Sequence, residues 1–435
     1  MILTLIISIS VFVLVTLSVL FFPSFSIKGH KIGTYWIIAL IGAALLLATL
    51  CLPIEEFWKG LTSSSAVNPL KILILFFSMT VLSVYLDECG LFRYLAKLAV
   101  RLSGKSQFLL LGVIYALAAI LTVFTSNDVV ILTLTPFIVF FAKHTKINPI
   151  PYLVAEFVAA NTWSMMLLIG NPTNVYLGTS AGIDFASYFK VMALPTLAAG
   201  VLEIGLVYLL FFRHLKEEIV PEEDDFKIES KADLIIGLIH LGLCLGFLIA
   251  SSYLPFEMWL VALIAASSLV LTSTIYHLLD HKHWSYLAHT AERLPYQLIP
   301  FVISMFVIVA SLQYQGVASK IGEWLSNTHP IWGYGLSSFL VANLVNNIPM
   351  SVLFSVLPVG MPEPSYLQAI YASIIGSNIG AFLTPVGALA GIMFSSLLAQ
   401  YDIHYGFKEF VRYGFLIALP VILISLTALQ LVLQA

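Results

Sequence analysis

The feature that most constrains this chain is a pair of matching interruptions in its long apolar segments, one pair in each half. The first half carries Thr-Ser-Asn-Asp at 125–128 and Ile-Gly-Asn-Pro-Thr-Asn at 169–174. The second half carries Val-Asn-Asn-Ile-Pro at 345–349 and Ile-Gly-Ser-Asn-Ile-Gly at 375–380. Lipid offers no hydrogen-bond partner to the backbone groups that a helix break leaves unpaired. Such breaks therefore persist only where protein or a water-filled cavity surrounds them. Breaks at corresponding places in two halves are typical of a secondary transporter's binding site.

Composition identifies a polytopic membrane protein. Of the 435 residues, 60% are hydrophobic and 10% are charged, whereas a soluble domain is about a quarter charged. The net charge of -3 indicates no nucleic-acid partner. The cysteines, Cys51, Cys89 and Cys244, have no metal or disulfide spacing, so we expect them to be packing residues. No phosphate-binding loop or hydrolase motif occurs, which predicts a protein that is not an enzyme and has no cofactor.

The apolar segments predict two inverted repeats joined by a charged linker. A spanning helix needs about 20 apolar residues. The first repeat, 1–212, is predicted to contain spans 2–22, 32–52, 70–88 and 187–212, a hairpin at 107–143 and a broken helix at 149–180. Residues 213–231 form the cytoplasmic linker. The second repeat, 232–435, is predicted to contain spans 232–252, 256–277, 295–313 and 407–432, a hairpin at 331–361 and a broken helix at 365–400.

This pattern predicts an all-α fold with about ten transmembrane helices. Each hairpin is interrupted in its middle, so we expect both to be re-entrant, with their tips deep in the membrane. The four spans and the broken helix of a repeat make five crossings, and a re-entrant hairpin adds none. Because five is odd, the second repeat enters the membrane with opposite polarity. If the N-terminus is outside, only Lys59, Lys71, Lys190 and Lys320 of the 20 Lys and Arg lie outside. This bias places both termini outside. Segments 91–102 and 317–325 are predicted to be equivalent amphipathic helices, the first at the cytoplasmic interface.

Asp128 is the sharpest candidate for a functional side chain. It follows Asn127 at the tip of the first hairpin and precedes an uncharged run, 129–142. A carboxylate at membrane depth is costly and is functional by default, so a proton-coupling or substrate role is predicted. The alternative is an N-cap, in which the carboxylate accepts from first-turn amides.

Uncharged polar residues and helix-breaking glycines supply the remaining candidates. Their amides and hydroxyls can bind substrate or ions, and sodium is a candidate ion at the hairpin tips. The helix breaks turn backbone groups and helix ends toward such a site. The alternative is that these residues only satisfy backbone groups freed at a kink. The candidate site residues are Ser126, Asn127, Asp128, Gly170, Asn171, Thr173, Asn174, Asn346, Asn347, Gly376, Ser377, Asn378 and Thr384. Glu156 and Glu203, and less so His240, are candidates for a proton relay or for interhelical hydrogen bonds.

At these motifs the sequence resembles the ion transporter superfamily, and most closely the arsenite/antimonite efflux permeases. The resemblance spans nearly the whole chain and rests on Leu-Asp-Glu-Cys-Gly-Leu-Phe at 86–92, the motifs above, and Thr-Pro-Val-Gly-Ala-Leu-Ala-Gly at 384–391. It implies a scaffold domain and a mobile transport domain, an elevator motion, and a site lined by Asn127, Asp128, Asn346, Asn347 and the broken helices. It also implies metalloid extrusion driven by protons, and pairing with a cytosolic ATPase in some members.

The second broken helix departs from the efflux permeases. They usually carry an acidic residue and a following Lys here, whereas this chain has Asn378 and Phe382. The leading hypothesis is an inner-membrane secondary transporter for proton-coupled arsenite or antimonite efflux. The alternatives are a sodium- or proton-coupled carrier of anions or carboxylates, a sodium/proton antiporter and, from another class, a channel. The expected partners are a small inorganic or anionic substrate and the lipid bilayer, and a homo-oligomer is compatible with the sequence.

Overall fold

The computed structural model describes residues 1–22, 24–27, 30–62, 68–216, 218–219, 228, 230–251, 253–254, 256–280 and 285–434. The first half contains α1 (Ile2–Phe21), β1 (Ser24–Ile27), β2 (His30–Gly33), α2 (Thr34–Ala48), α3 (Ile54–Thr62), α4 (Pro69–Glu88), α5 (Leu91–Ser103), α6 (Gln107–Phe124), α7 (Asn127–Thr145), α8 (Ile150–Trp163), the 3-10 turn η1 (Leu168–Gly170), α9 (Pro172–Ser180) and α10 (Phe185–Phe211). The second half contains α11 (Lys231–Ser251), α12 (Met258–Asp280), α13 (Ser285–Arg293), α14 (Leu298–Tyr314), α15 (Val317–Ser326), α16 (Pro330–Val345), α17 (Asn347–Phe354), α18 (Glu363–Gly380), α19 (Leu389–Gln400) and α20 (Phe407–Gln434).

The helices from α4 to α10 correspond in order to those from α14 to α20. Each series runs through a long helix, a short amphipathic helix, a hairpin, a helix broken in its middle and a final long helix. The short helices α5 and α15 both follow a glycine of positive φ, Gly90 at 82° and Gly316 at 72°. The predicted division at 213–231 falls between the series, although most of that linker lies outside the described residues. The inverted orientation of the halves stays a prediction.

Local sequence explains where the central helices begin. Asn68 accepts from the backbone N–H of Leu70 at 2.8 Å ahead of Pro69 in the first turn of α4, and Asp184 accepts from Ser187 N–H at 2.9 Å to begin α10. Side-chain oxygens at these positions satisfy amides that have no partner within the helix. Proline in the first turn sacrifices no helical hydrogen bond. These caps are why the predicted starts of both helices agree with the structure to within two residues.

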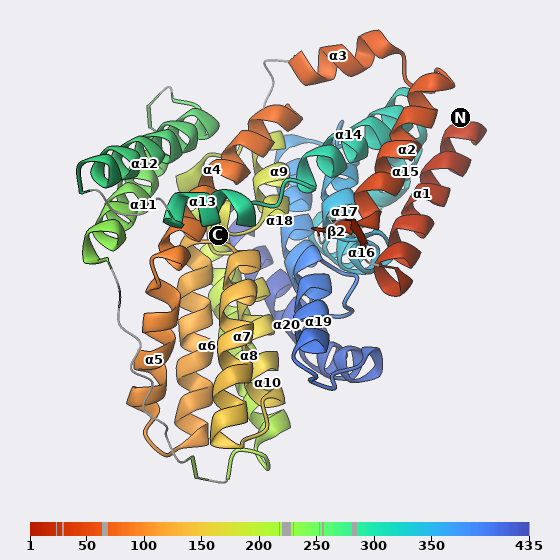
Figure 1. Cartoon of the computed structure of the whole chain (residues 1–435). Helices are drawn as coiled ribbons and strands as arrows, with labels where there is room; N and C mark the ends of the chain where they lie inside the picture. Colours follow the sequence, from red (N-terminus) through yellow and green to blue (C-terminus); the bar gives the residue numbers. More distant parts are fainter. Residues whose placement is uncertain are drawn as a thin grey trace.

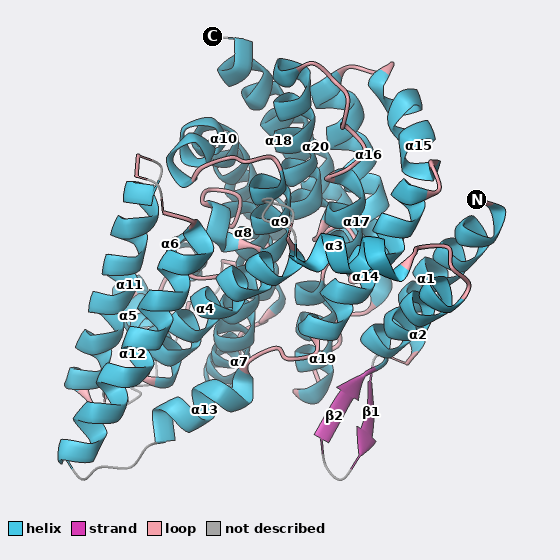
Figure 2. Cartoon of the chain, turned by 90° about the horizontal axis from the view of Figure 1, so that it is seen from above, coloured by secondary structure: helices cyan, strands magenta, loops and turns pink. Residues whose placement is uncertain are grey.

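The two halves interlock through their broken helices. Figure 1 shows α5, α6, α7, α8 and α10 as neighbouring, nearly parallel helices, with α11 and α12 on one side and α1 and α2 on the other. Figure 2 shows the antiparallel β1–β2 hairpin projecting at the edge of the molecule beside α1 and α2. The second-half helix α18 packs against α8 and α9, and α10 packs against α20. The hydrophobic core is therefore shared by both halves.

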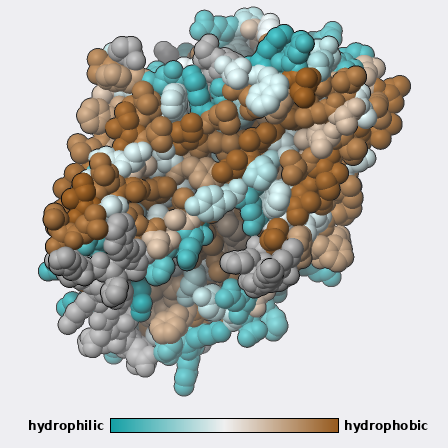
Figure 3. Space-filling view, turned by 45° about the horizontal axis from the view of Figure 1, so that its top comes forward, coloured by the Kyte–Doolittle hydropathy of each residue, from teal (hydrophilic) through white to brown (hydrophobic). Residues whose placement is uncertain are grey.

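The outer surface suits a bilayer. Eight helices in the described part of the chain are long and apolar enough to cross a membrane, and α1, α2, α16 and α19 contribute shorter apolar stretches. Figure 3 shows exposed hydrophobic residues gathered in a broad band across one face, with more hydrophilic surface above and below it. The predicted all-α polytopic fold is confirmed. Because α6 and α7 are each long enough to cross, re-entrance of the first hairpin stays a prediction.

The structure adds detail that the apolar pattern did not give. The first break spans 164–171 and so begins before its motif at 169–174, whereas the second spans 381–388 and follows its motif at 375–380. Gly376 and Asn378 therefore lie inside α18. The second hairpin is asymmetric, since α17 has only 8 residues. No element was predicted for α3, α13 or the β1–β2 hairpin, and α13 proves to border the cavity described below.

Candidate functional site

The centre of the molecule is a hydrogen-bonded network across the first break. Asn378, in the last turn of α18, accepts from the Ser164 hydroxyl at 2.8 Å and from Asn171 Nδ2 at 2.9 Å. Its Nδ2 donates to Asn174 Oδ1 at 2.6 Å and to the Ile374 carbonyl at 2.8 Å. An amide side chain has two donors and room for two acceptor bonds. Asn378 therefore uses its whole hydrogen-bonding capacity within the protein.

The neighbours of Asn378 are satisfied in the same way. Asn171 caps α9 by accepting from the N–H and hydroxyl of Thr173, both at 3.1 Å. The Ser377 hydroxyl donates to Thr173 Oγ1 at 3.0 Å, and Asn174 donates to the Ser164 carbonyl at 2.8 Å. These side chains are at most 2% exposed. The network supplies partners to backbone that the break has freed, as one of the two readings of the sequence predicts.

Close approach explains the glycine at the first break. A Cβ atom on Gly170 would lie 2.3 Å from the Ser164 carbonyl oxygen, which no side chain tolerates. The sharp return of the chain between α8 and α9 therefore depends on this residue.

The tip of the second hairpin docks on the second break. Asn347 N–H donates to the Gly387 carbonyl at 3.0 Å, and Asn346 Nδ2 donates to the Val386 carbonyl at 2.9 Å. Asn346 has φ 75°, which is uncommon for a residue other than glycine. The Thr384 hydroxyl donates at 2.8 Å to Oδ1 of Asn343, which lies outside the predicted motifs. The second pair of predicted motifs is thus also in contact.

The tip of the first hairpin differs, because it holds oxygen atoms without partners. Asn127 Nδ2 donates to Asn161 Oδ1 at 3.2 Å. Asn127 Oδ1 and Ser126 Oγ are buried and have no hydrogen-bond partner among the described residues. Buried polar atoms are nearly always paired, and neutral oxygens are suitable ligands for hard cations. Asn161 was missed, although it ends an apolar run just before the break, which is the signal that could have found it.

Asp128, in the first turn of α7, follows these residues and lines a cavity of about 610 Å³. No hydrogen bond or ion pair joins its carboxylate to any other part of the described chain. The N-cap alternative is therefore not what the structure shows. The cavity walls come from α4, α7, α19, the start of α2 and the turn between α13 and α14, and they include Ser126, Tyr35, Thr80, Arg293 and Ser396.

The charges around this cavity are mostly negative. The charged side chains lining it are Asp128, Glu292 and Arg293. The Arg293 guanidinium is paired with two carboxylates, those of Asp87 and Glu88. Among the residues that the structure describes, the cavity therefore has no lining cation that is not already compensated. An anion would find attraction chiefly at the N-terminal ends of α7, α14 and α19, which lie at the cavity wall.

The other predicted carboxylates and His240 lie away from this cavity. Both carboxylate oxygens of Glu156 accept from the Thr135 hydroxyl at 3.0 Å. Glu203 accepts from the Thr162 hydroxyl, and its second oxygen has no partner within the described chain. His240 contacts the Ile236 carbonyl at 2.7 Å and Ser268 at 3.2 Å. The structure thus separates a hairpin-tip group, Ser126 to Asp128, from an inner network of amides and from these interhelical links.

Comparisons with known proteins agree with the fold. The model of the CitMHS citrate transporter family matches residues 31–376. The chain belongs to this family. It is 25% identical to the arsenical pump membrane protein of Escherichia coli (strain K12) over 97% of each chain. It is 27% identical to an uncharacterized transporter of Synechocystis sp. over 90% of each chain.

A solved structure extends the comparison. The crystal structure of the Alcanivorax borkumensis YdaH transporter matches with a TM-score of 0.52 and 16% identity, over 99% of this chain and 97% of that one. This identity speaks to the fold alone. With the family match over residues 31–376, this shared fold confirms the resemblance to the ion transporter superfamily. The family match shows that this chain is a multi-pass membrane transporter.

Proposed function

We propose that this protein is a secondary transporter of the inner membrane that exports arsenite or antimonite as a small uncharged hydroxide in exchange for protons. The observation that carries the proposal is Asp128, a carboxylate that has no partner among the described residues and lines a cavity in a membrane protein. Such a group can bind and release a proton as its surroundings change. Asp128 is proposed as the coupling group, beside the unpartnered oxygens of Ser126 and Asn127.

The charge of the cavity supports an uncharged substrate. A solute with several negative charges would meet the Asp128 and Glu292 carboxylates without an uncompensated lining cation in the described residues. Like charges brought together in such a site are costly. A neutral hydroxide avoids this cost, and its O–H groups can donate to polar groups that line the cavity, the Asp128 carboxylate among them. The name of the Escherichia coli relative, an arsenical pump membrane protein, points the same way.

The proposed movement is an elevator. The hairpins and broken helices pack on one another through buried polar contacts, at Asn378 and at Gly387. Such contacts favour motion of these elements as one body past the remaining helices. Alternating access then carries Asp128 and its cavity from one side of the membrane to the other.

A second candidate is a carboxylate carrier coupled to sodium or protons. Two observations favour it: the family model carries the name of a citrate transporter, and the N-termini of α7 and α19 border the cavity, where a carboxylate is attracted. Sodium would then bind the unpartnered oxygens at the first hairpin tip. Dependence of citrate uptake on sodium, with no transport of arsenite, is the result that selects this candidate.

The test compares two carboxylate variants in inside-out membrane vesicles. Asp128→Asn removes the titrating group with little change of shape, and we expect it to abolish arsenite uptake driven by a pH gradient. Asp402→Asn is the matched control, because Asp402 is exposed and has a left-handed conformation that Asn adopts readily. Its uptake should equal that of the parent. Wild-type uptake by the Asp128→Asn protein would refute the proposal.

A further inference from the structure

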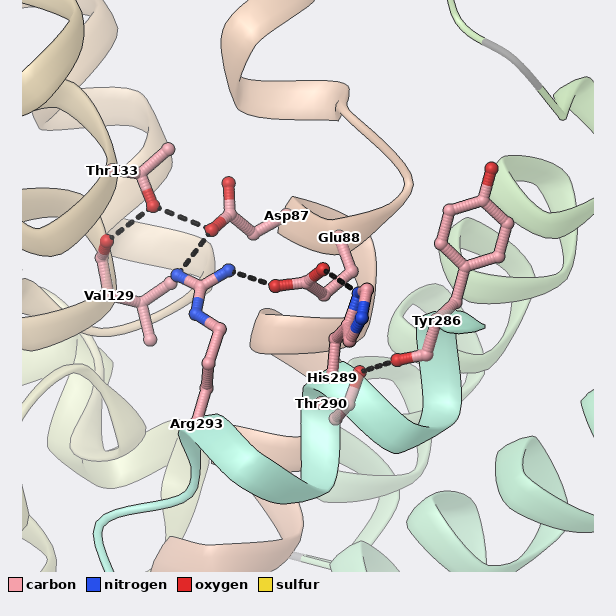
Figure 4. Close-up of polar contacts among 8 residues, drawn as sticks. All are labelled: Asp87, Glu88, Val129, Thr133, Tyr286, His289, Thr290 and Arg293. Carbon is pink, nitrogen blue, oxygen red and sulfur yellow. Dashed lines mark hydrogen bonds and ion pairs between the residues drawn. The ribbon is translucent and has the colours of Figure 1, made fainter. Parts of the chain in front are cut away.

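The end of α4 carries a second charged cluster, outside the hairpin-tip group. Figure 4 shows Arg293 reaching from α13 to both Asp87 and Glu88. Arg293 Nη2 lies 2.6 Å from Asp87 Oδ2, and Nη1 lies 2.5 Å from Glu88 Oε1. His289, also on α13, lies 3.4 Å from the other oxygen of Glu88. The cluster ties α13 to the end of α4.

The same cluster reaches the first hairpin. The Thr133 hydroxyl on α7 donates to Asp87 Oδ2 at 2.8 Å and lies 2.9 Å from the Val129 carbonyl. Thr133 follows Asp128 by five residues, about 7.5 Å along a helix. The single hydroxyl thus connects the charged cluster to the segment that begins with Asp128.

Arg293 also lies between two cavities along α7. Asp128, Val129 and Leu132 line the cavity already described, whereas Thr133, Pro136, Phe137 and Phe140 line a second one of about 610 Å³. Arg293 lines both. Its position makes the cluster a contact point between α13, α4 and the moving hairpin.

The contact is strong enough to bias a conformation. The Asp87 side chain is 7% exposed, so its charge depends on Arg293 and Thr133 for compensation. Hydrogen bonds to charged groups are stronger than those between neutral groups. Removing one partner of a buried pair leaves the other uncompensated. The arrangement therefore favours the state in which Thr133 lies against Asp87.

We propose that Asp87 and Arg293 are positioning residues. They hold α7 in the position in which Asp128 faces the first of the two cavities, the one that Asp128 lines. The hydrogen bond from Thr133 to Asp87 breaks when Asp128 moves to the opposite side of the membrane. This inference rests on the proposed alternating access. Arg293 acts through Asp87, and Asp87 acts through Thr133, so neither is required to touch the substrate.

Thiol labelling tests the proposal without any substrate. Ser396→Cys serves as the reporter, because Ser396 on α19 lines the Asp128 cavity and is exposed. The native cysteines are all buried, and the protein without the reporter gives the background rate. An impermeant trimethylammonium methanethiosulfonate is applied to vesicles of each orientation. The ratio of the two labelling rates measures which side the cavity faces.

Four variants in the reporter background make the test specific. Thr133→Val removes the hydroxyl at similar volume, and Arg293→Gln removes the guanidinium. We expect each to lower the preference of the parent for one side about tenfold, as the loss of a charge-assisted hydrogen bond implies. Thr133→Ser retains the donor and should stay within about twofold of the parent. Lys71→Met removes the ion pair in which Lys71 Nζ lies 2.5 Å from Glu257 Oε2, at the other end of α4. This variant should leave the preference for one side unchanged.

The outcomes separate this inference from the proposed function. An unchanged preference in Thr133→Val overturns the inference, as does an equal loss in Lys71→Met, which would indicate general loosening. If Arg293→Gln does not fold, the contrast between Thr133→Val and Thr133→Ser decides alone. Wild-type transport by Asp128→Asn would refute the proposed function and leave these labelling rates unaffected.

Discussion

Replacement of Asn378 by alanine should be among the most destabilising substitutions in this protein. The change removes four hydrogen bonds at once, those to Ser164, Asn171, Asn174 and the Ile374 carbonyl. Asn378 is fully buried, so no bulk water replaces them. A hydrogen bond contributes roughly 0.5–1.5 kcal/mol net, and interhelical bonds in membranes average about 0.6 kcal/mol. Four such bonds predict a loss of about 2–6 kcal/mol, and about 2.4 kcal/mol at the membrane average.

Unfolding in mixed detergent micelles, followed by tryptophan fluorescence, measures this loss. Asn327→Ala is the control, because Asn327 is exposed and donates a single bond, to Glu323 at 3.0 Å. It should cost no more than about 0.5 kcal/mol. If Asn378→Ala proved as stable as Asn327→Ala, the network would not hold the break, and a ligand role for Asn378 would gain support.

Three further comparisons between variants test the packing and the charges. Gly376→Ala should reduce the yield of folded protein, because the new Cβ would lie 2.0 Å from Ser338 Oγ and 2.4 Å from the Gly335 carbonyl, whereas Gly205→Ala, with no neighbour within 4 Å, should not. At the second hairpin tip, Asn346→Gly should be about 1 kcal/mol more stable to detergent unfolding than Asn346→Ala, because glycine accepts the positive φ. Lys71 and Trp259 donate to Glu257 and hold its pKa below the usual value. The stabilisation from these contacts is complete above the pKa of Glu257 in the unfolded state, about 4.3. It is lost as the pH falls through the lower pKa of Glu257 in the folded state. The melting temperature of the parent should therefore fall slightly more than that of Glu257→Gln on acidification, and the difference should be small because solvent screens this exposed pair.

Long apolar runs and helix caps made most of the fold predictable. The bounds of α4 and α10 differ from the predicted spans by no more than two residues, since Asn68 and Asp184 mark their starts. The helices α3 and α13 were missed because each has only 9 residues and lacks an apolar run. The second break was placed too early, because α18 stays helical through Gly376 where its glycine packs closely on α16.

The candidate site was predictable as a set of residues and not as an arrangement. Sequence motifs identified Asn171, Asn174 and Asn378, but the bond between Asn171 and Asn378 joins residues 207 positions apart. Only the fold shows that these amides satisfy one another while Asp128 faces a cavity. Arg293 was missed for the same reason, since it pairs with Glu88 across 205 positions.

The central claim is that Asp128 couples proton movement to the transport of an uncharged hydroxide. Proteoliposomes containing only this protein, without ATP, test it most directly. The account predicts that an imposed pH gradient drives arsenite against its concentration gradient, and that a protonophore or Asp128→Asn stops the accumulation. Arsenite uptake that only equilibrates, or that proceeds equally with Asp128→Asn, would contradict it.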